Sequence, residues 1–114
     1  MMPDGALEVM YHDCDPEEAA DAVSNLKVHA EATFDEKTRT AAWRRIPSAY
    51  LVCEDDRAIP LAGQEAMIQT VKDEGGVIEV ERIAFAHSPY IGKPEPVAAF
   101  IDRAARGEGQ EVPR

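Results

Sequence analysis

Two residues of this chain, Asp56 and His87, could together carry out acid–base chemistry. Asp56 comes soon after the apolar run SAYLVC at 48–53, and His87 follows the run VIEVERIAF at 77–85. If both runs are neighbouring parallel strands, the two side chains lie at the sheet edge where ligands bind in such folds. The carboxylate could then fix the tautomer of the histidine and stabilise its imidazolium while the histidine acts as a general base. The spacing fits equally well with two ordinary solvated loop residues, and His87 alone could also be a metal ligand.

The elements that would position these residues follow from the sequence pattern. The apolar run at 48–53 is typical of a strand covered on both faces, and the run at 77–85 is rich in β-branched residues. Between them a proline begins and a Gly-Gly pair ends a predicted helix over 61–74. A second helix is predicted at 94–106 from its apolar stripe. The order strand, helix, strand, helix predicts parallel strands with a right-handed crossover, and hence an α/β fold.

The N-terminal part of the chain is predicted to be partly helical. The segment 15–26 opens with Asp15 as an N-cap, followed by a proline and by a glutamate three positions further on, which predicts a helix. The segment 27–39 has weak periodicity and is either a loop or a short excursion. A second short helix is predicted through 40–45, and the polar tail at 107–114 is expected to be flexible.

Charge and composition exclude several classes of partner. The chain has 114 residues, with 22 acidic against 12 basic residues, and its net charge of -10 opposes binding to nucleic acid or to an anionic membrane. No apolar stretch approaches the ~20 residues of a membrane span, and 1–10 is unlike a signal peptide. We therefore expect a cytoplasmic protein without nucleic-acid or membrane partners, in which Cys14 and Cys53 are free thiols.

No cofactor or metal site is predicted. The run HDCD at 12–15 bunches possible metal ligands, but consecutive residues rarely converge on one metal. There is no phosphate-binding loop or glycine-rich dinucleotide fingerprint. Trp43 and Tyr50 are expected to cover the edge of the sheet rather than to bind a ligand.

Two long blocks of the sequence carry a family resemblance. IPSAYLVCEDDRAIPLAGQEAMI at 46–68 and FAHSPYIGKPEPVAAFI at 85–101 closely resemble the C-terminal segment of α/β-hydrolases, in the branch of small esterases and hydroxynitrile lyases. The segments YHDCDPEEAADAVSNL and AAWRRIPS are similar to the end of the cap region in that branch. In the family pattern the last Asp of an acidic cluster is the triad acid, which matches Asp56, with Asp55 as the near alternative. The histidine of the family's HSP step matches His87, so the resemblance implies a catalytic acid and base. It also implies a carboxylate oxygen of Asp56 within hydrogen-bond reach of a His87 ring nitrogen.

The resemblance runs from about Met10 to Arg106 and implies one domain over 1–114. Within it, 10–45 would be the end of the cap, 46–106 the core strands and helices, and 107–114 a flexible tail. The fold class expected is therefore α/β: a partial α/β-hydrolase fold, with a small remnant of parallel sheet flanked by helices.

The serine nucleophile of the family has no counterpart in the chain. None of Ser24, Ser48 and Ser88 lies in the G-x-S-x-G elbow that such hydrolases use, and the nucleophile should precede the acid by a long stretch. Ser88 follows His87 directly, but adjacent residues of an extended chain point to opposite sides. The chain thus resembles about the last two fifths of a hydrolase and is expected to be inactive alone.

Two functions remain open from the sequence. The chain could be the acid and base half of a serine esterase or amide hydrolase, acting on a small ester or amide only when a complementary half completes it. It could instead be a non-catalytic, truncated hydrolase-like domain that serves as an interaction module. An open apolar strand edge at 48–53 predicts self-association into a homo-oligomer or pairing with the complementary half, because such edges template pairing and two strands are marginal alone.

Overall fold

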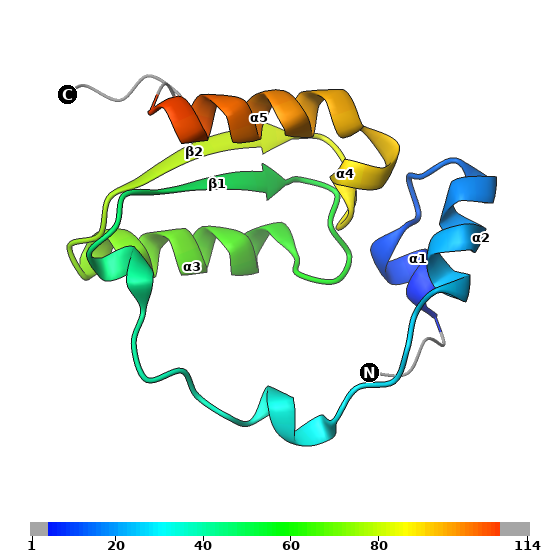
Figure 1. Cartoon of the computed structure of the whole chain (residues 1–114), viewed down its shortest axis with the longest axis horizontal. Helices are drawn as coiled ribbons and strands as arrows, with labels where there is room; N and C mark the ends of the chain where they lie inside the picture. The colour runs from blue at the N-terminus through cyan, green and yellow to red at the C-terminus, as the bar shows by residue number, and fades with distance from the viewer. Residues whose placement is uncertain (1–4, 108–114) are drawn as a thin grey trace.

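The computed structural model describes residues 5–107 and has two parallel strands at its centre (Figure 1). Strands β1 (Ser48–Cys53) and β2 (Ile78–Ile83) pair in parallel with their first residues opposite each other and their last residues opposite each other. Helix α3 (Leu61–Asp73) connects them, and helix α5 (Pro94–Arg106) follows β2. The predicted α/β order of strand, helix, strand, helix is confirmed.

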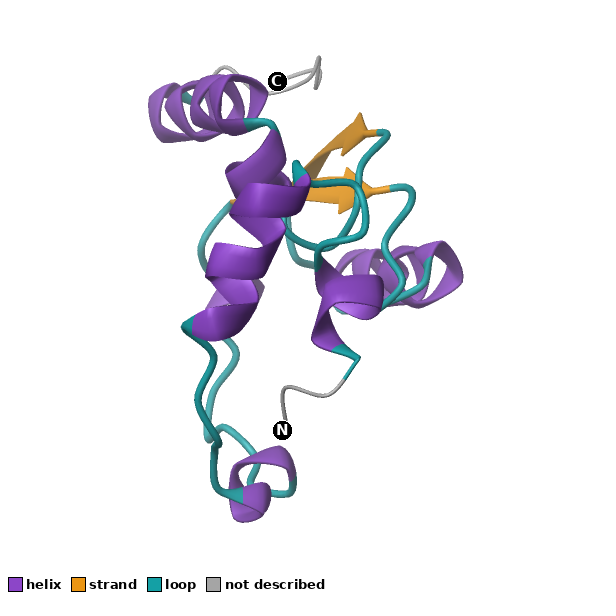
Figure 2. Cartoon of the chain, turned by 90° about the vertical axis from the view of Figure 1, so that its right-hand side faces the viewer, coloured by secondary structure: helices purple, strands orange, loops and turns teal. Residues whose placement is uncertain are grey.

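The two long helices lie on opposite faces of the sheet, as both views show (Figures 1 and 2). Glu81 and Arg82 are adjacent in β2, so their side chains point to opposite faces. Arg103 of α5 donates to Glu81 at 3.0 Å, whereas Arg82 donates to Glu65 of α3 at 3.0 Å. The sheet is therefore covered by α5 on one side and by α3 on the other.

The N-terminal part forms a separate helical pair beside the carboxyl ends of the strands (Figure 1). It consists of α1 (Ala6–Met10) and α2 (Pro16–Ser24), and the side chain of Asp15 accepts from the first backbone N–H groups of α2, as predicted for an N-cap. A core cluster joins this pair to the segment after β2. Its buried members are Tyr11, Cys14, Ala19, Phe85 and Ala86.

The connection from α2 to β1 is long and exposed. It contains two one-turn 3₁₀ helices, at Glu31–Phe34 and Ala42–Arg44, and every residue in 27–40 is exposed. The short helix predicted through 40–45 is thus a single turn, and 27–39 is a loop with one turn in it. The boundary predicted at residues 45 and 46 between a cap end and a core stays a prediction.

One predicted strand end differs from the structure, and the short helices α1 and α4 (Pro89–Gly92) were not predicted. β2 ends at Ile83 rather than at Phe85, because Phe85 leaves the strand to pack in the core cluster. Helix α4 is one turn long and brings its last residue so close to the Phe85 ring that a Cβ there would overlap the ring. Within the described part of the chain no helix is long and apolar enough to cross a membrane. The tail predicted to be flexible lies, from residue 108 onward, outside the described residues.

Candidate functional site

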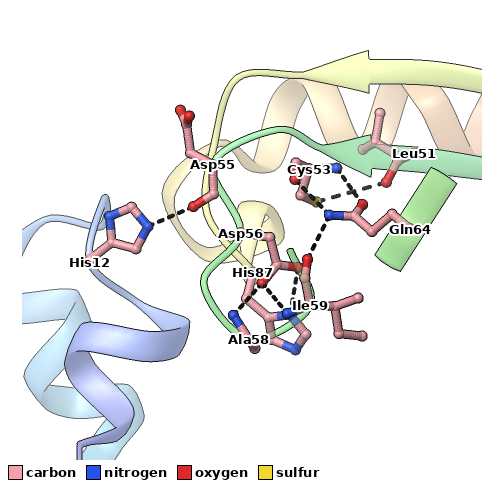
Figure 3. Close-up of polar contacts among 9 residues, drawn as sticks. All are labelled: His12, Leu51, Cys53, Asp55, Asp56, Ala58, Ile59, Gln64 and His87. Carbon is pink, nitrogen blue, oxygen red and sulfur yellow. Dashed lines mark hydrogen bonds and ion pairs between the residues drawn. The ribbon is translucent and has the colours of Figure 1, made fainter. Parts of the chain in front are cut away.

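The loops after β1 and β2 bring Asp56 and His87 into direct contact (Figure 3). Nδ1 of His87 lies 2.9 Å from Oδ2 of Asp56, so the predicted contact between the two residues is confirmed. The side chain of Asp56 is 5% exposed and that of His87 is 33% exposed. The carboxylate is therefore held inside the loop, while the imidazole reaches the surface with its second nitrogen pointing away from Asp56.

The loop itself fixes the orientation of the Asp56 carboxylate. Its Oδ1 accepts hydrogen bonds from the backbone N–H groups of Ala58 at 2.7 Å and Ile59 at 2.9 Å. Such an Asx-turn uses one carboxylate oxygen to hold the chain that follows. The other oxygen, Oδ2, is left to accept the proton on His87 Nδ1, which selects the tautomer with its free lone pair on Nε2.

Asp55, the near alternative for the acid, does not contact His87. Its side chain is exposed and points away from the imidazole in Figure 3. Its backbone ties the loop to neighbouring segments: the N–H donates to the carbonyl of Phe85 at 3.1 Å, and the carbonyl accepts from His12 Nε2 at 2.8 Å. The geometry therefore pairs His87 with Asp56.

Gln64 is part of the site and was missed by the sequence reasoning. It lies in the first turns of α3 and is 1% exposed. Its side-chain amide bonds the backbone of Cys53 twice and the carbonyl of Ile59 once. No sequence signal distinguishes this glutamine from a solvated one, because its partners are backbone groups.

The N-terminal helical pair also contacts the loop that carries Asp56. Besides its bond to the Asp55 carbonyl, His12 places Nδ1 3.0 Å from a carboxylate oxygen of Asp13. Arg57 donates to Glu8 of α1 at 2.7 Å in an exposed pair. Residues of the HDCD run thus help to pack the loop that carries Asp56. Among residues 5–107, no group of three or more His, Cys, Asp and Glu side chains could hold a metal ion.

Two of the three serines donate their hydroxyl groups to backbone carbonyls. The hydroxyl of Ser24 donates to a carbonyl of its own helix at 2.7 Å, and that of Ser48 donates to the carbonyl of Ile46 at 2.9 Å. Ser88 is 2% exposed at the start of α4, next to the partly exposed His87. The prediction that the Ser88 hydroxyl is poorly placed to reach the His87 ring stays a prediction.

Cys53 is the thiol nearest to the candidate acid. It is buried, and burial together with the Asp56 carboxylate raises the pKa of its thiol above the ordinary value. A thiol acts as a nucleophile in its ionised form, so these surroundings favour the less reactive, protonated form of Cys53. Cys14 is buried as well, and neither cysteine is in a disulfide.

A groove of about 430 Å³ lies at the other end of β1. It is mostly apolar and lies between β1, α3 and the turn at Ala42–Arg44. Its lining consists of Trp43, Ser48, Ala49, Tyr50, Met67, Ile68, Thr70, Val71 and Ile78. Because Asp56 and His87 lie beyond the carboxyl ends of the strands, this groove is separate from the acid–histidine pair.

The fold and the site together define an α/β protein with an acid–histidine pair at the carboxyl edge of a parallel sheet. No family model matches the chain. It is, however, 35% identical over 109 residues to alpha/beta hydrolase nvfD of Aspergillus novofumigatus, in a match that covers 96% of this chain and 42% of that protein. It is also 30% identical over 82 residues to a probable hydrolase of a Phoma species, covering 71% of this chain and 34% of that protein.

The chain is therefore related to the α/β-hydrolases, in agreement with its parallel sheet and flanking helices. It spans less than half the length of the relatives that it matches.

Proposed function

We propose that this chain carries the acid and the general base of a hydrolase that cleaves a small ester or amide. The observation that carries the proposal is the contact between Asp56 and His87, with a nearly buried carboxylate on Nδ1 and the imidazole partly exposed. Relatedness to α/β-hydrolases supports the reaction class. The serine nucleophile and the oxyanion hole would come from a polypeptide segment outside these 114 residues.

In this reaction His87 acts through Nε2. It takes the proton of the serine hydroxyl as the oxygen attacks the carbonyl carbon, and it then gives that proton to the leaving alcohol or amine. Asp56 keeps the other ring proton on Nδ1 and stabilises the positive charge on the ring while both nitrogens are protonated. The two backbone N–H groups on Oδ1 hold the carboxylate in place throughout.

The contacts of the chain's own candidate nucleophiles support the need for a second segment. Ser24 and Ser48 donate to backbone carbonyls, and Cys53 is kept protonated by burial. Removal of a nucleophile leaves only the contributions of the oxyanion hole and substrate binding. We therefore expect the isolated chain to hydrolyse short activated esters no faster than its His87→Ala variant.

A chimera tests the catalytic role directly. The chain would replace the matching segment of an α/β-hydrolase that reacts with a fluorophosphonate probe, since this label reports a serine activated by its base. We expect labelling by the chimera, with loss in His87→Ala and a drop of about 10⁴-fold in the turnover of Asp56→Asn. Asp55→Asn is the matched control and should retain labelling and turnover. A chimera that is labelled equally with and without His87 would overturn the proposal.

A second candidate function, as an interaction module, is favoured by the open side of β1. Among residues 5–107 no further strand pairs with β1 on the side away from β2, and the apolar groove lies beside that strand. An exposed strand edge can pair with another chain. A second copy of this chain or the complementary hydrolase half would be the partner. If this function is correct, the chain should still associate in the His87→Ala and Asp56→Asn variants.

A further inference from the structure

The side-chain amide of Gln64 binds both ends of the loop that carries Asp56. Its Oε1 accepts from the N–H of Cys53 at 2.9 Å, and its Nε2 donates to the carbonyl of Cys53 at 2.8 Å. The same Nε2 also donates to the carbonyl of Ile59 at 2.9 Å. One side chain from α3 thus joins the last residue of β1 to the residue that completes the Asx-turn of Asp56 (Figure 3).

The Gln64 amide bonds the backbone of Cys53 on the side of β1 that faces away from β2. Successive residues of a strand point their N–H and C=O groups to opposite sides, and Ser48 and Glu54 both donate toward the β2 segment at 2.9 Å. The odd-numbered residues Ala49, Leu51 and Cys53 therefore point these groups away from β2. At Cys53 the Gln64 amide supplies the donor and acceptor that a peptide group of a neighbouring strand would supply.

The geometry points to Gln64 as a positioning residue for Asp56. By holding Cys53 and Ile59 together, Gln64 sets the path of residues 54–58. That path in turn directs Oδ2 of Asp56 toward His87. This inference rests on the proposed function only in calling Asp56 the catalytic acid. The structural claim is that the contact between Asp56 and His87 depends on Gln64.

Two variants of Gln64 test this dependence. Gln64→Met keeps the length of the side chain and removes all three hydrogen bonds, while Gln64→Glu keeps the shape but turns a carboxylate oxygen toward the carbonyls of Cys53 and Ile59. In both variants we expect the His87 Nδ1 proton to exchange with water about tenfold faster or more. The reason is that the loop no longer holds the Asp56 carboxylate that accepts this proton. The readout is the ¹H–¹⁵N signal of the His87 ring in the folded chain.

Two controls separate positioning from a general loss of stability. Gln69 lies five residues further along the same helix, and its side chain donates to the exposed Asp73 at 2.8 Å, so Gln69→Met should leave the His87 signal unchanged. Val71→Ala should lower stability through the buried face of α3 without touching the loop. An equal acceleration in Val71→Ala, or an unchanged His87 signal in a folded Gln64→Met, would overturn the inference.

The unmodified chain offers a measurement that needs no variant to fold. The amides of Leu51 and Cys53 point to the same side of β1, but only Cys53 is bound by Gln64. At a dilution where the chain is monomeric, we expect the Cys53 amide to exchange with solvent about tenfold more slowly than that of Leu51. Equal exchange at the two positions would count against the inference. Neither the His87 measurement nor the amide exchange depends on hydrolysis. A failure of the Gln64 inference can therefore be told apart from a failure of the proposed function, which an unlabelled chimera would show.

Discussion

Replacement of Asp56 by Asn changes the charge of the central pair with little change in shape. The carboxylate accepts from Ala58 at 2.7 Å, from Ile59 at 2.9 Å and from His87 at 2.9 Å. The amide oxygen of Asn can keep both backbone donors, but its NH₂ group then faces Nδ1 of His87. Two donors cannot share one hydrogen bond, so we expect His87 to move its proton from Nδ1 to Nε2.

The expected cost to stability follows from the same three contacts. Hydrogen bonds to charged groups contribute about 1.5–3 kcal/mol and neutral ones about 0.5–1.5 kcal/mol. Replacing the charged carboxylate by a neutral amide therefore weakens each of the three bonds by about 1 kcal/mol. Relief from holding a charge in a nearly buried side chain offsets part of the total of about 3 kcal/mol. We expect Asp56→Asn to lower the free energy of unfolding by about 1–3 kcal/mol.

The assay is ¹H–¹⁵N NMR of the histidine ring nitrogens, together with urea unfolding. Spectra taken at about pH 8, where an ordinary histidine is neutral, distinguish the two tautomers. Asp55→Asn is the control, because its exposed carboxylate points away from the ring, and it should change stability by no more than about 0.5 kcal/mol. Retention of the Nδ1 proton in Asp56→Asn, or the same tautomer shift in Asp55→Asn, would refute the reasoning.

Four further expectations concern the whole chain. Gly92→Ala should cost about 1–3 kcal/mol in unfolding free energy, since the new Cβ overlaps the Phe85 ring, and a neutral result would contradict this packing. Burial raises the pKa of the Cys14 and Cys53 thiols, so the folded state keeps protons that the unfolded state releases. The contribution of these two thiols to stability should stay level below about pH 8 and be lost above it, so stability in urea titrations should fall above that pH; a rise there would be the wrong sign. The chain alone should not be labelled by a fluorophosphonate, and labelling at Ser88 would defeat that expectation. Light scattering after size exclusion should detect self-association at micromolar concentration, and a monomer with cooperative unfolding would exclude it.

The parts of the fold that the sequence predicts are those with strong local patterns. The long helices and both strands have clear periodicity or composition, and their order implies neighbouring parallel strands. That topology places residues 56 and 87 at one edge, and the resemblance to α/β-hydrolases singles out Asp56 and His87 as the pair expected to be in contact. The end of β2 could not be predicted, because Phe85 leaves the strand for tertiary packing against the N-terminal helices.

The supporting contacts of the site were beyond sequence reasoning for a different reason. Gln64 bonds to backbone groups, which every residue has, so its partners leave no mark in the sequence. The sequence groups His12 with other metal-ligating residue types, whereas in the structure its Nε2 bonds to the backbone carbonyl of Asp55. Residues that hold a loop through its main chain can be found only once the fold is known.

The bonding along the outer side of β1 separates the two proposed functions in space. Gln64 occupies that side at Cys53, so an incoming strand could pair only further back, at Ala49 and Leu51, beside the apolar groove. Partner binding there would leave the loop of Asp56 in place, because α3 already supplies its anchor. The acid and base can therefore be preorganised in this chain whether or not a partner is bound, while a nucleophile has to be brought to them. The NMR signal of His87 should accordingly be present in the unpartnered chain, and only serine labelling should wait for the complementary half.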